Sequence, residues 1–241
     1  MLTVLSVEAR KLNRSLAAVL AIAAPSLIAV FAFFMLLRGD KPMPWEMWLG
    51  SANGIWAYFM LPMSVTALTA LVAHMEHGPK SWDHLRALPL PRWKIYAAKA
   101  ICVLAVIAVM SVAVMGLTVL AIKAASMIKP AVAPTGPLEL ARHAKTLAMM
   151  FGASFLLVAI QLWIALRYAS FVPGLVVGIG GTFFAVVATS ARQGVFLPWQ
   201  MPVNMLASEP WRVNTALGLG LGVGLLALIA LILHLSRREV L

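Results

Sequence analysis

Residues 100–122 read AICVLAVIAVMSVAVMGLTVLAI, without a single charged side chain. A helix of about 20 apolar residues crosses roughly 30 Å of hydrocarbon, and this run is long enough to do so. The run lacks the regular apolar–polar alternation of strands in an outer-membrane barrel. Because no water reaches the bilayer core, backbone groups there must pair within their own helix. The stretch is therefore predicted to be a membrane-spanning helix, and it decides the fold class.

Five more apolar runs of this kind lie before and after it. The chain has 241 residues, 62% hydrophobic and 11% charged, whereas soluble proteins are about half apolar and a quarter charged. The first run is too long for a cleavable signal, whose apolar region has about 7–15 residues. We expect an all-α membrane protein with a single domain over residues 1–241, and six transmembrane helices are expected at residues 15–37, 51–73, 100–122, 146–166, 168–191 and 213–233.

The positive charge of the chain falls mostly between these runs. A net charge of +11 would suggest nucleic acid in a soluble protein. Loop Lys and Arg residues of a membrane protein contact lipid headgroups instead, so membrane lipids and no nucleic acid are expected as partners. Six spans put both termini on one side, which carries 11 of the 19 Lys and Arg residues against 8 on the other. This bias predicts cytoplasmic termini.

The residues before the first span form an amphipathic pattern. Apolar residues recur at steps of three and four, at Leu2, Leu5, Ala9, Leu12 and Leu16. Most positions between them are polar or charged, and include Glu8, Arg10, Lys11, Asn13 and Arg14. The pattern predicts a helix lying in the membrane interface. The alternative is a cationic flank that only orients the first span.

Two features near the C-terminus leave alternatives open. Small residues recur at Gly174 and Gly178 and at every second position over residues 218–224. Such spacing lets helices approach closely, either within one chain or between two copies. Residues 192–212 contain two Pro-Trp pairs and an apolar body. They are expected to lie in the interface or to enter the membrane as short helical pieces; the alternative is an aromatic belt anchor.

Between the second and third runs, residues 74–94 read HMEHGPKSWDHLRALPLPRWK. Gly78-Pro79 ends one helix, Ser81 is a good N-cap and Pro89 stops the next helix. A short helix over residues 81–88 is predicted, with Trp82, Leu85 and Leu88 on its apolar face and Asp83 and Arg86 paired on its polar face. It suits docking onto another protein; the alternative is lipid anchoring by Trp82 and Trp93.

The longer run EHGPKSWDHLRALPLPRWKIYAAKA, residues 76–100, resembles the loop after the second span of ABC-2-type transporter permeases. It looks closest to the branch of lantibiotic-immunity and related peptide or drug exporters. The residues that match the family pattern are Leu85, Ala87, Leu88, Pro89, Leu90, Pro91, Arg92, Ile95, Tyr96, Ala98 and Lys99. Outside this loop the similarity lies in hydropathy rather than in individual residues.

The resemblance implies a pair of permeases in the bacterial inner membrane, either two copies or this chain with a related one, above cytoplasmic ABC ATPase subunits. It implies a cytoplasmic coupling helix containing Ser81, Trp82, Asp83, Leu85, Arg86 and Leu88, which fits a cleft on the ATPase. The N-terminal helix would be the connecting helix, with Glu8, Arg10, Lys11 and Arg14. ATP and Mg would bind the ATPase, and no cofactor would bind this chain.

The resemblance also implies that the second and fifth spans face the partner permease and line the path of the cargo. The uncharged polar residues Asn53, Thr66 and Thr182 are candidates for that path. The alternative is that each side chain bonds its own helix or a neighbouring one.

Several kinds of chemistry are missing from the sequence. No glycine is followed by lysine, so there is no phosphate-binding P-loop and the chain is not expected to be an enzyme. His74, Glu76 and His77 are too few for an expected metal site, and the single Cys102 allows no disulfide within the chain. A carrier driven by protons or sodium generally has an ionisable residue within its spans. The six runs contain no charged residue, so energy from a separate ATPase is favoured over ion-coupled transport.

We therefore expect the permease subunit of an ATP-driven exporter of an amphipathic peptide, drug or lipid-like cargo. The alternative is a membrane anchor or assembly factor that docks a soluble partner through residues 74–94.

Overall fold

The computed structural model describes residues 1–77 and 90–237. It confirms an all-α architecture, since the described residues contain no strand and only one isolated β-bridge, between Pro44 and Thr135. The predicted helix at residues 81–88, with Ser81, Trp82, Asp83, Leu85, Arg86 and Leu88, lies outside the described residues.

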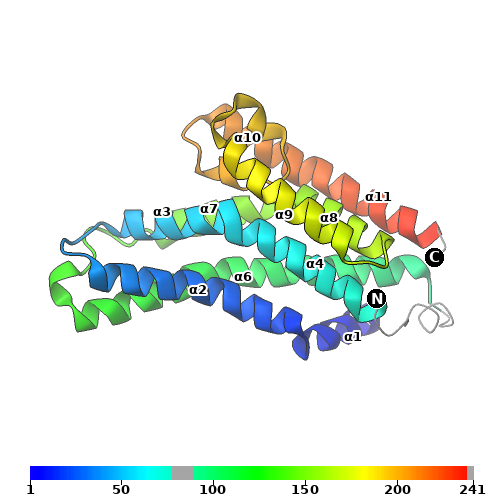
Figure 1. The fold of residues 1–241 in the computed structure, drawn as a ribbon, viewed down its shortest axis with the longest axis horizontal. Coiled ribbons are helices and arrows are strands. Elements are labelled where there is room, and N and C mark those ends of the chain that lie inside the picture. The colour runs from blue at the N-terminus through cyan, green and yellow to red at the C-terminus, as the bar shows by residue number, and fades with distance from the viewer. Residues whose placement is uncertain (78–89, 238–241) are drawn as a thin grey trace.

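The helices follow the order of Figure 1. They are α1 (Leu2–Asn13), α2 (Leu16–Arg38), α3 (Trp45–Ile55), α4 (Leu61–His77), α6 (Arg92–Ile128), α7 (Leu140–Ala153), α8 (Phe155–Arg167), α9 (Val172–Val187), α10 (Pro210–Leu217) and α11 (Gly224–Arg237). Single π-helical turns, Trp56–Met60 and Gly218–Val223, join α3 to α4 and α10 to α11. Each of these joined pairs is therefore one continuous long helix.

Four helical segments among the described residues are long and apolar enough to cross a membrane: Leu16–Arg38, Trp45–His77, Arg92–Ile128 and Pro210–Arg237. Helices α7 and α8, which meet at a 41° bend, make a fifth if they count as one span. Helix α9 is apolar but has only 16 residues. The structure thus supports a multi-pass membrane protein, and the count of six spans stays a prediction.

The observed helices extend beyond the charge-free runs of the sequence. Helix α6 has 37 residues where residues 100–122 were expected, which makes it about 55 Å long. Lys and Arg are good helix formers, so the charges that end the apolar run do not end the helix. Part of α6 therefore stands outside the hydrocarbon.

Figure 1 shows two groups of helices. Helices α2, α3 and α6 run close to the longest axis, and α4, α8, α9 and α11 are inclined to it, sloping in the same direction in this view. Helices α2 and α6 pack along much of their length, while α4 lies against α8 and α9. The start of α1 and the last turn of α11 lie at the same end of the bundle, which we call the base.

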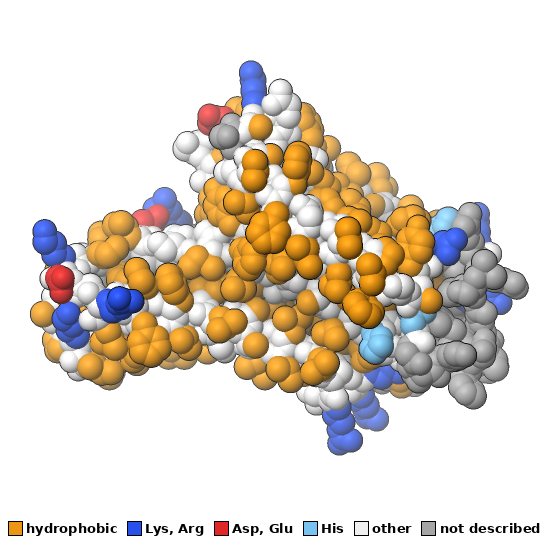
Figure 2. Space-filling view, viewed as in Figure 1, with side chains coloured by type: hydrophobic (Ala, Val, Ile, Leu, Met, Phe, Trp, Pro, Cys, Tyr) orange, Lys and Arg blue, Asp and Glu red, His pale blue; other side chains and the backbone are white. Residues whose placement is uncertain are grey.

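The surface view agrees with a bilayer environment. Hydrophobic side chains cover most of the face in Figure 2, and Lys and Arg side chains gather at its ends and projections. Large apolar side chains on α2 and α9, such as Ile22, Phe31, Phe183 and Phe184, are exposed. An apolar surface this extensive fits lipid or another membrane helix rather than water.

Three glycines sit where helices touch. A side chain on Gly178 would collide with Thr66, and side chains on Gly220 and Gly224 would collide with the backbone of residues 153–156. Internal packing therefore explains these three positions, whereas Gly174 has open space around its Cα. A dimerising role for the remaining small residues stays a prediction.

Residues 192–212 form short helical pieces that pack against the bundle, and their place in the interface or the membrane stays a prediction. They form two 3-10 helices, Arg192–Phe196 and Val203–Leu206. Val195, Trp199 and Met201 are buried, so the apolar body of this segment packs into the core. Upstream, residues 168–171 join α8 to α9 in the predicted hairpin.

Candidate functional site

Four charged side chains from three helices meet at the base of the bundle. Glu8 and Lys11 come from α1, Glu76 from the last turn of α4, and Lys99 from the third turn of α6. Residues 78–89, which contain the predicted coupling helix, connect α4 to α6 at this end. The four side chains therefore lie beside both attachment points of that segment.

The four side chains form a closed ring of alternating charge, which we call the charge ring. The Lys99 ammonium donates to Glu8 Oε2 and to Glu76 Oε1, both at 2.7 Å. The Lys11 ammonium donates to Glu8 Oε1 at 3.0 Å and to Glu76 Oε1 at 2.8 Å. Each lysine thus bridges both carboxylates, and the ring carries no net charge.

The charge ring is shielded from water on most sides. The side chain of Lys99 is 0% exposed and that of Glu76 is 1% exposed, whereas Lys11 is 32% exposed. A charge buried without a partner is very unfavourable, so these groups are tolerated because each contacts two of opposite sign. Removing one member leaves uncompensated charge and costs about 3–5 kcal/mol in typical buried pairs.

The surroundings also hold Lys11 in its charged form. Burial by itself would lower the pKa of the Lys11 ammonium, but the hydrogen bonds and negative charges of Glu76 and Glu8 raise that pKa above its ordinary value. Lys11 therefore remains a cation over the whole physiological range, and α1 stays attached to α4 across that range.

Helix α1 packs part of its predicted apolar face, Leu5 and Leu12, into the core, but it also buries one residue predicted to be on the polar face. Glu8 was expected among the polar positions with Arg10 and Arg14, but Glu8 is buried, as is Leu12 one turn later. Leu2 is exposed, although it belongs to the predicted apolar face. The physical reason is that Glu8 gains two ammonium partners by facing inward, which outweighs the burial of Leu2. Arg10 and Arg14 are exposed, as expected.

Sequence reasoning missed the charge ring. Glu76 was considered only for a metal site, and Lys99 only as the end of the family-like pattern. The sequence did contain one indication of this pairing. Glu76 is the first Asp, Glu, Lys or Arg after the second apolar run, and Lys99 is the last before the third, so a single loop separates them. Among the described residues, no three His, Cys, Asp or Glu side chains come together as a metal site requires.

The candidate path residues lie inside the chain's own packing. The Thr66 hydroxyl donates to Pro62 O at 2.9 Å and the Thr182 hydroxyl donates to Gly178 O at 2.7 Å, each within its own helix. Asn53 Nδ2 lies 3.3 Å from His143 Nδ1 on α7. These bonds match the alternative of local hydrogen bonding, and a role in the cargo path stays a prediction.

A second group of charges lies at the opposite end of the bundle. Glu46 at the start of α3 pairs with Arg142 Nη1 at 3.2 Å and with His143 Nε2 at 3.3 Å. The side chain of Glu46 is 49% exposed and that of Arg142 is 64% exposed. This group, which we call the outer cluster, joins α3 to α7; Glu46 and Arg142 are open to solvent, whereas His143 is buried.

Comparison with known proteins adds one finding. A family model described as "ABC-2 family transporter protein" matches residues 4–187, from α1 to the end of α9. No curated protein and no solved structure matches the chain. The match covers the charge ring and the outer cluster, and stops before α10 and α11.

Proposed function

The chain belongs to the ABC-2 family of transporter proteins, and on that premise we propose that it is the permease subunit of an ATP-driven exporter. Membership makes it a membrane component of an ABC transporter that works with an ABC ATPase. Outward transport, an amphipathic peptide, drug or lipid-like cargo, and the peptide- or drug-exporter branch are parts of the proposal. So are its place in a bacterial inner membrane and its cytoplasmic termini.

The observation that carries the proposal is the charge ring. A permease without its own nucleotide site must receive movement from a separate subunit. Residues 78–89 leave α4 beside Glu76 and return to α6 before Lys99, and Glu8 and Lys11 of α1 close the ring between them. A displacement of residues 78–89 by an ATPase would therefore act on three helices at once.

The strength of the ring supports this coupling. Pulling α1, α4 and α6 apart would expose buried charges to an apolar environment, which is unfavourable by several kcal/mol. The three helices are consequently expected to move as one body, with the connecting helix α1 included. Rigid-body motion of this kind is a standard way for small movements at one site to reach a distant one.

A second permease, a further copy or a related chain, is the expected partner within the membrane. Helix α9 exposes Val176, Phe183 and Phe184, and Phe183 meets Phe59 edge-on with ring centroids 6.3 Å apart. Small residues and aromatic rings suit close helix packing in a bilayer. We place the cargo path along this face, with the buried Thr66 and Thr182 behind it.

One experiment tests docking to the ATPase. Truncation of Trp82 to alanine should weaken association by about 2 kcal/mol, roughly thirtyfold, since interface tryptophans carry much of the binding free energy. The matched control is Trp93→Ala, because Trp93 is half-exposed in the first turn of α6. The measurement is co-purification of the ATPase with each permease. Equal recovery with both variants would remove the docking role of residues 81–88.

A second experiment separates coupling from docking. Lys11→Gln should leave ATPase binding unchanged but lower cargo-stimulated ATP hydrolysis and export, because the charge ring loses one of its two ammonium groups. Arg10→Gln, one residue away and exposed, is the control. Stimulated hydrolysis that is the same in both variants would contradict coupling through the ring. An ATPase that binds and hydrolyses ATP with no export at all would favour a membrane anchor or assembly factor.

Orientation has its own test. In a Cys102→Ala background, Ser81→Cys should resist an impermeant thiol reagent added to intact cells, and Thr135→Cys should react. Thr135 lies at the end of the bundle opposite the base and is exposed. The reverse labelling pattern would put the termini outside.

A further inference from the structure

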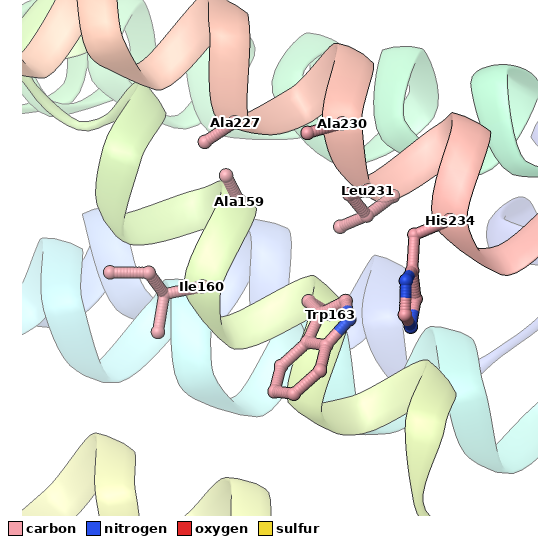
Figure 3. Close-up of a pocket in the computed structure, with 7 residues that line it drawn as sticks. All are labelled: Ala159, Ile160, Trp163, Ala227, Ala230, Leu231 and His234. Atoms are coloured by element: carbon pink, nitrogen blue, oxygen red, sulfur yellow. The ribbon is translucent and has the colours of Figure 1, made fainter.

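A groove lies between α8 and α11. Seven residues line it: Ala159, Ile160, Trp163, Ala227, Ala230, Leu231 and His234. Its volume is about 350 Å³, which falls within the range of ligand pockets in proteins. Figure 3 shows the two helices side by side with these side chains between them.

The groove exists because three of its lining residues are alanines. Ala159 on α8 faces Ala227 and Ala230 on α11, so the space between the helices stays unfilled at this level. Leu226 and Ile229, on the neighbouring positions of α11, are exposed. On a membrane protein such positions face acyl chains, so the groove opens toward the hydrocarbon.

One end of the groove is polar. Trp163 and His234 lie together at this end in Figure 3, with ring centroids 6.2 Å apart. The His234 Nε2 atom is shielded from solvent and has no hydrogen-bond partner. A buried polar atom without a partner is uncommon and calls for an explanation, such as a group that the structure does not contain.

The same end carries positive charge. Arg167 follows Trp163 by four residues and ends α8, and Arg237 follows His234 by three and ends α11. Residues three and four apart share a helix face, so both arginines are placed beyond the polar end of the groove. Neither α8 nor α11 contains an acidic residue.

We propose that this groove binds an anionic glycerophospholipid of the surrounding bilayer. One acyl chain lies along Ala159, Ala227 and Ala230, and the phosphate lies at the level of Trp163 and His234, within reach of Arg167 and Arg237. The order of apolar groove, aromatic ring and arginine matches the order of acyl chain, interface and headgroup in a lipid. The site does not depend on the proposed export function.

The test measures retained lipid directly. The full chain is reconstituted in vesicles of equal phosphatidylglycerol and phosphatidylethanolamine, extracted in mild detergent, and its bound lipids are quantified by mass spectrometry. The unmodified protein should retain phosphatidylglycerol in preference, by about fivefold or more, as expected for arginine near an anionic headgroup. Equal retention of the two lipids would overturn the proposal.

Two variants locate the site. Ala230→Leu fills the groove and should abolish the retained lipid, whereas Ala124→Leu, at an exposed position of α6, should not. Arg167→Gln with Arg237→Gln should keep lipid but lose the preference for phosphatidylglycerol. An unchanged lipid content in Ala230→Leu would refute the assignment, as would a change in oligomeric state without a change in lipid, which would make the groove an interface between copies.

Discussion

The charge ring at the base and the outer cluster at the opposite end use the same chemistry in different surroundings. Both join helices through lysine or arginine and glutamate at 2.7–3.2 Å. In the ring, Lys99 and Glu76 are fully buried, whereas in the outer cluster Glu46 and Arg142 are largely exposed. Distances alone would rank the two groups as near equals; burial separates them.

The difference in burial indicates at which end of the molecule the helices are more strongly held together. An exposed ion pair contributes about 0–1 kcal/mol, since water competes for both partners. Breaking a buried pair leaves a charge that water cannot reach, and the cost is several times larger. The base is therefore the rigid end, and the outer end can rearrange with little loss of stability.

Lys99→Met should give the largest effect. The substitution leaves Glu8 and Glu76 close together with only the half-buried Lys11 between them, and we expect a loss of about 3–5 kcal/mol. The measurement is chemical or thermal unfolding of the protein in detergent. The matched control is Lys94→Met, outside the ring on the first turn of α6. Equal stability of the Lys99→Met and Lys94→Met proteins would show that the charge ring contributes no more to stability than a lysine outside it.

Lys11→Met should have a smaller effect, because Lys99 still bridges both carboxylates and water reaches part of the vacated site. We expect a loss of about 1–2 kcal/mol. Because the pKa of Lys11 is raised in the folded protein, its contribution is complete below the ordinary value of 10.5 and disappears as the pH rises past the folded-state value. The unmodified protein should therefore lose stability when Lys11 deprotonates at high pH, and Lys11→Met should not show this loss.

Glu46→Gln should cost about 0–1 kcal/mol, since its pair with Arg142 is largely exposed and the glutamine amide can still hydrogen-bond the buried His143 ring. His143 keeps its contact with Asn53 in this variant. The same unfolding measurement applies. A loss as large as that of Lys99→Met would erase the distinction between the two ends.

The smallest expected effect is that of high salt on the stability penalties of these variants. At about 1 M salt the screening length falls to about 3 Å, which weakens exposed pairs and leaves buried pairs nearly untouched. The Glu46→Gln penalty should therefore vanish in high salt, while the Lys99→Met penalty persists. Loss of both penalties would indicate that water and ions enter the ring.

Much of the helical framework follows from the sequence. The apolar runs at residues 15–37 and 100–122 are long and uncharged, and α2 and α6 contain them. Their ends were harder to predict, because charged residues such as Lys99 and Lys123 continue a helix without breaking it. The bend between α7 and α8 was missed, although Ser154 lies there and its hydroxyl bonds Phe151 O.

The charge ring could not be predicted for a different reason. Glu8, Glu76 and Lys99 lie far apart in the chain, and their pairing depends on how α1 rotates against α4 and α6. The amphipathic pattern of α1 correctly predicted that Leu5 and Leu12 face the core, but not that two ammonium groups draw Glu8 inward beside them. A pattern of apolar residues cannot weigh a buried ion pair against an exposed leucine, so tertiary contacts decided the face.

Helix α6 runs without a break from the ring to the outer end, and this gives it the geometry of a lever arm. From Lys99 to Ile128 it covers about 44 Å at about 1.5 Å per residue. A tilt of only about 5° at the fixed base would swing its far tip by about 4 Å. At that tip, the Lys129 ammonium donates to Gly39 O at 2.8 Å and holds the end of α2. A small displacement at the base is thereby magnified into a large one at the opposite end of the bundle.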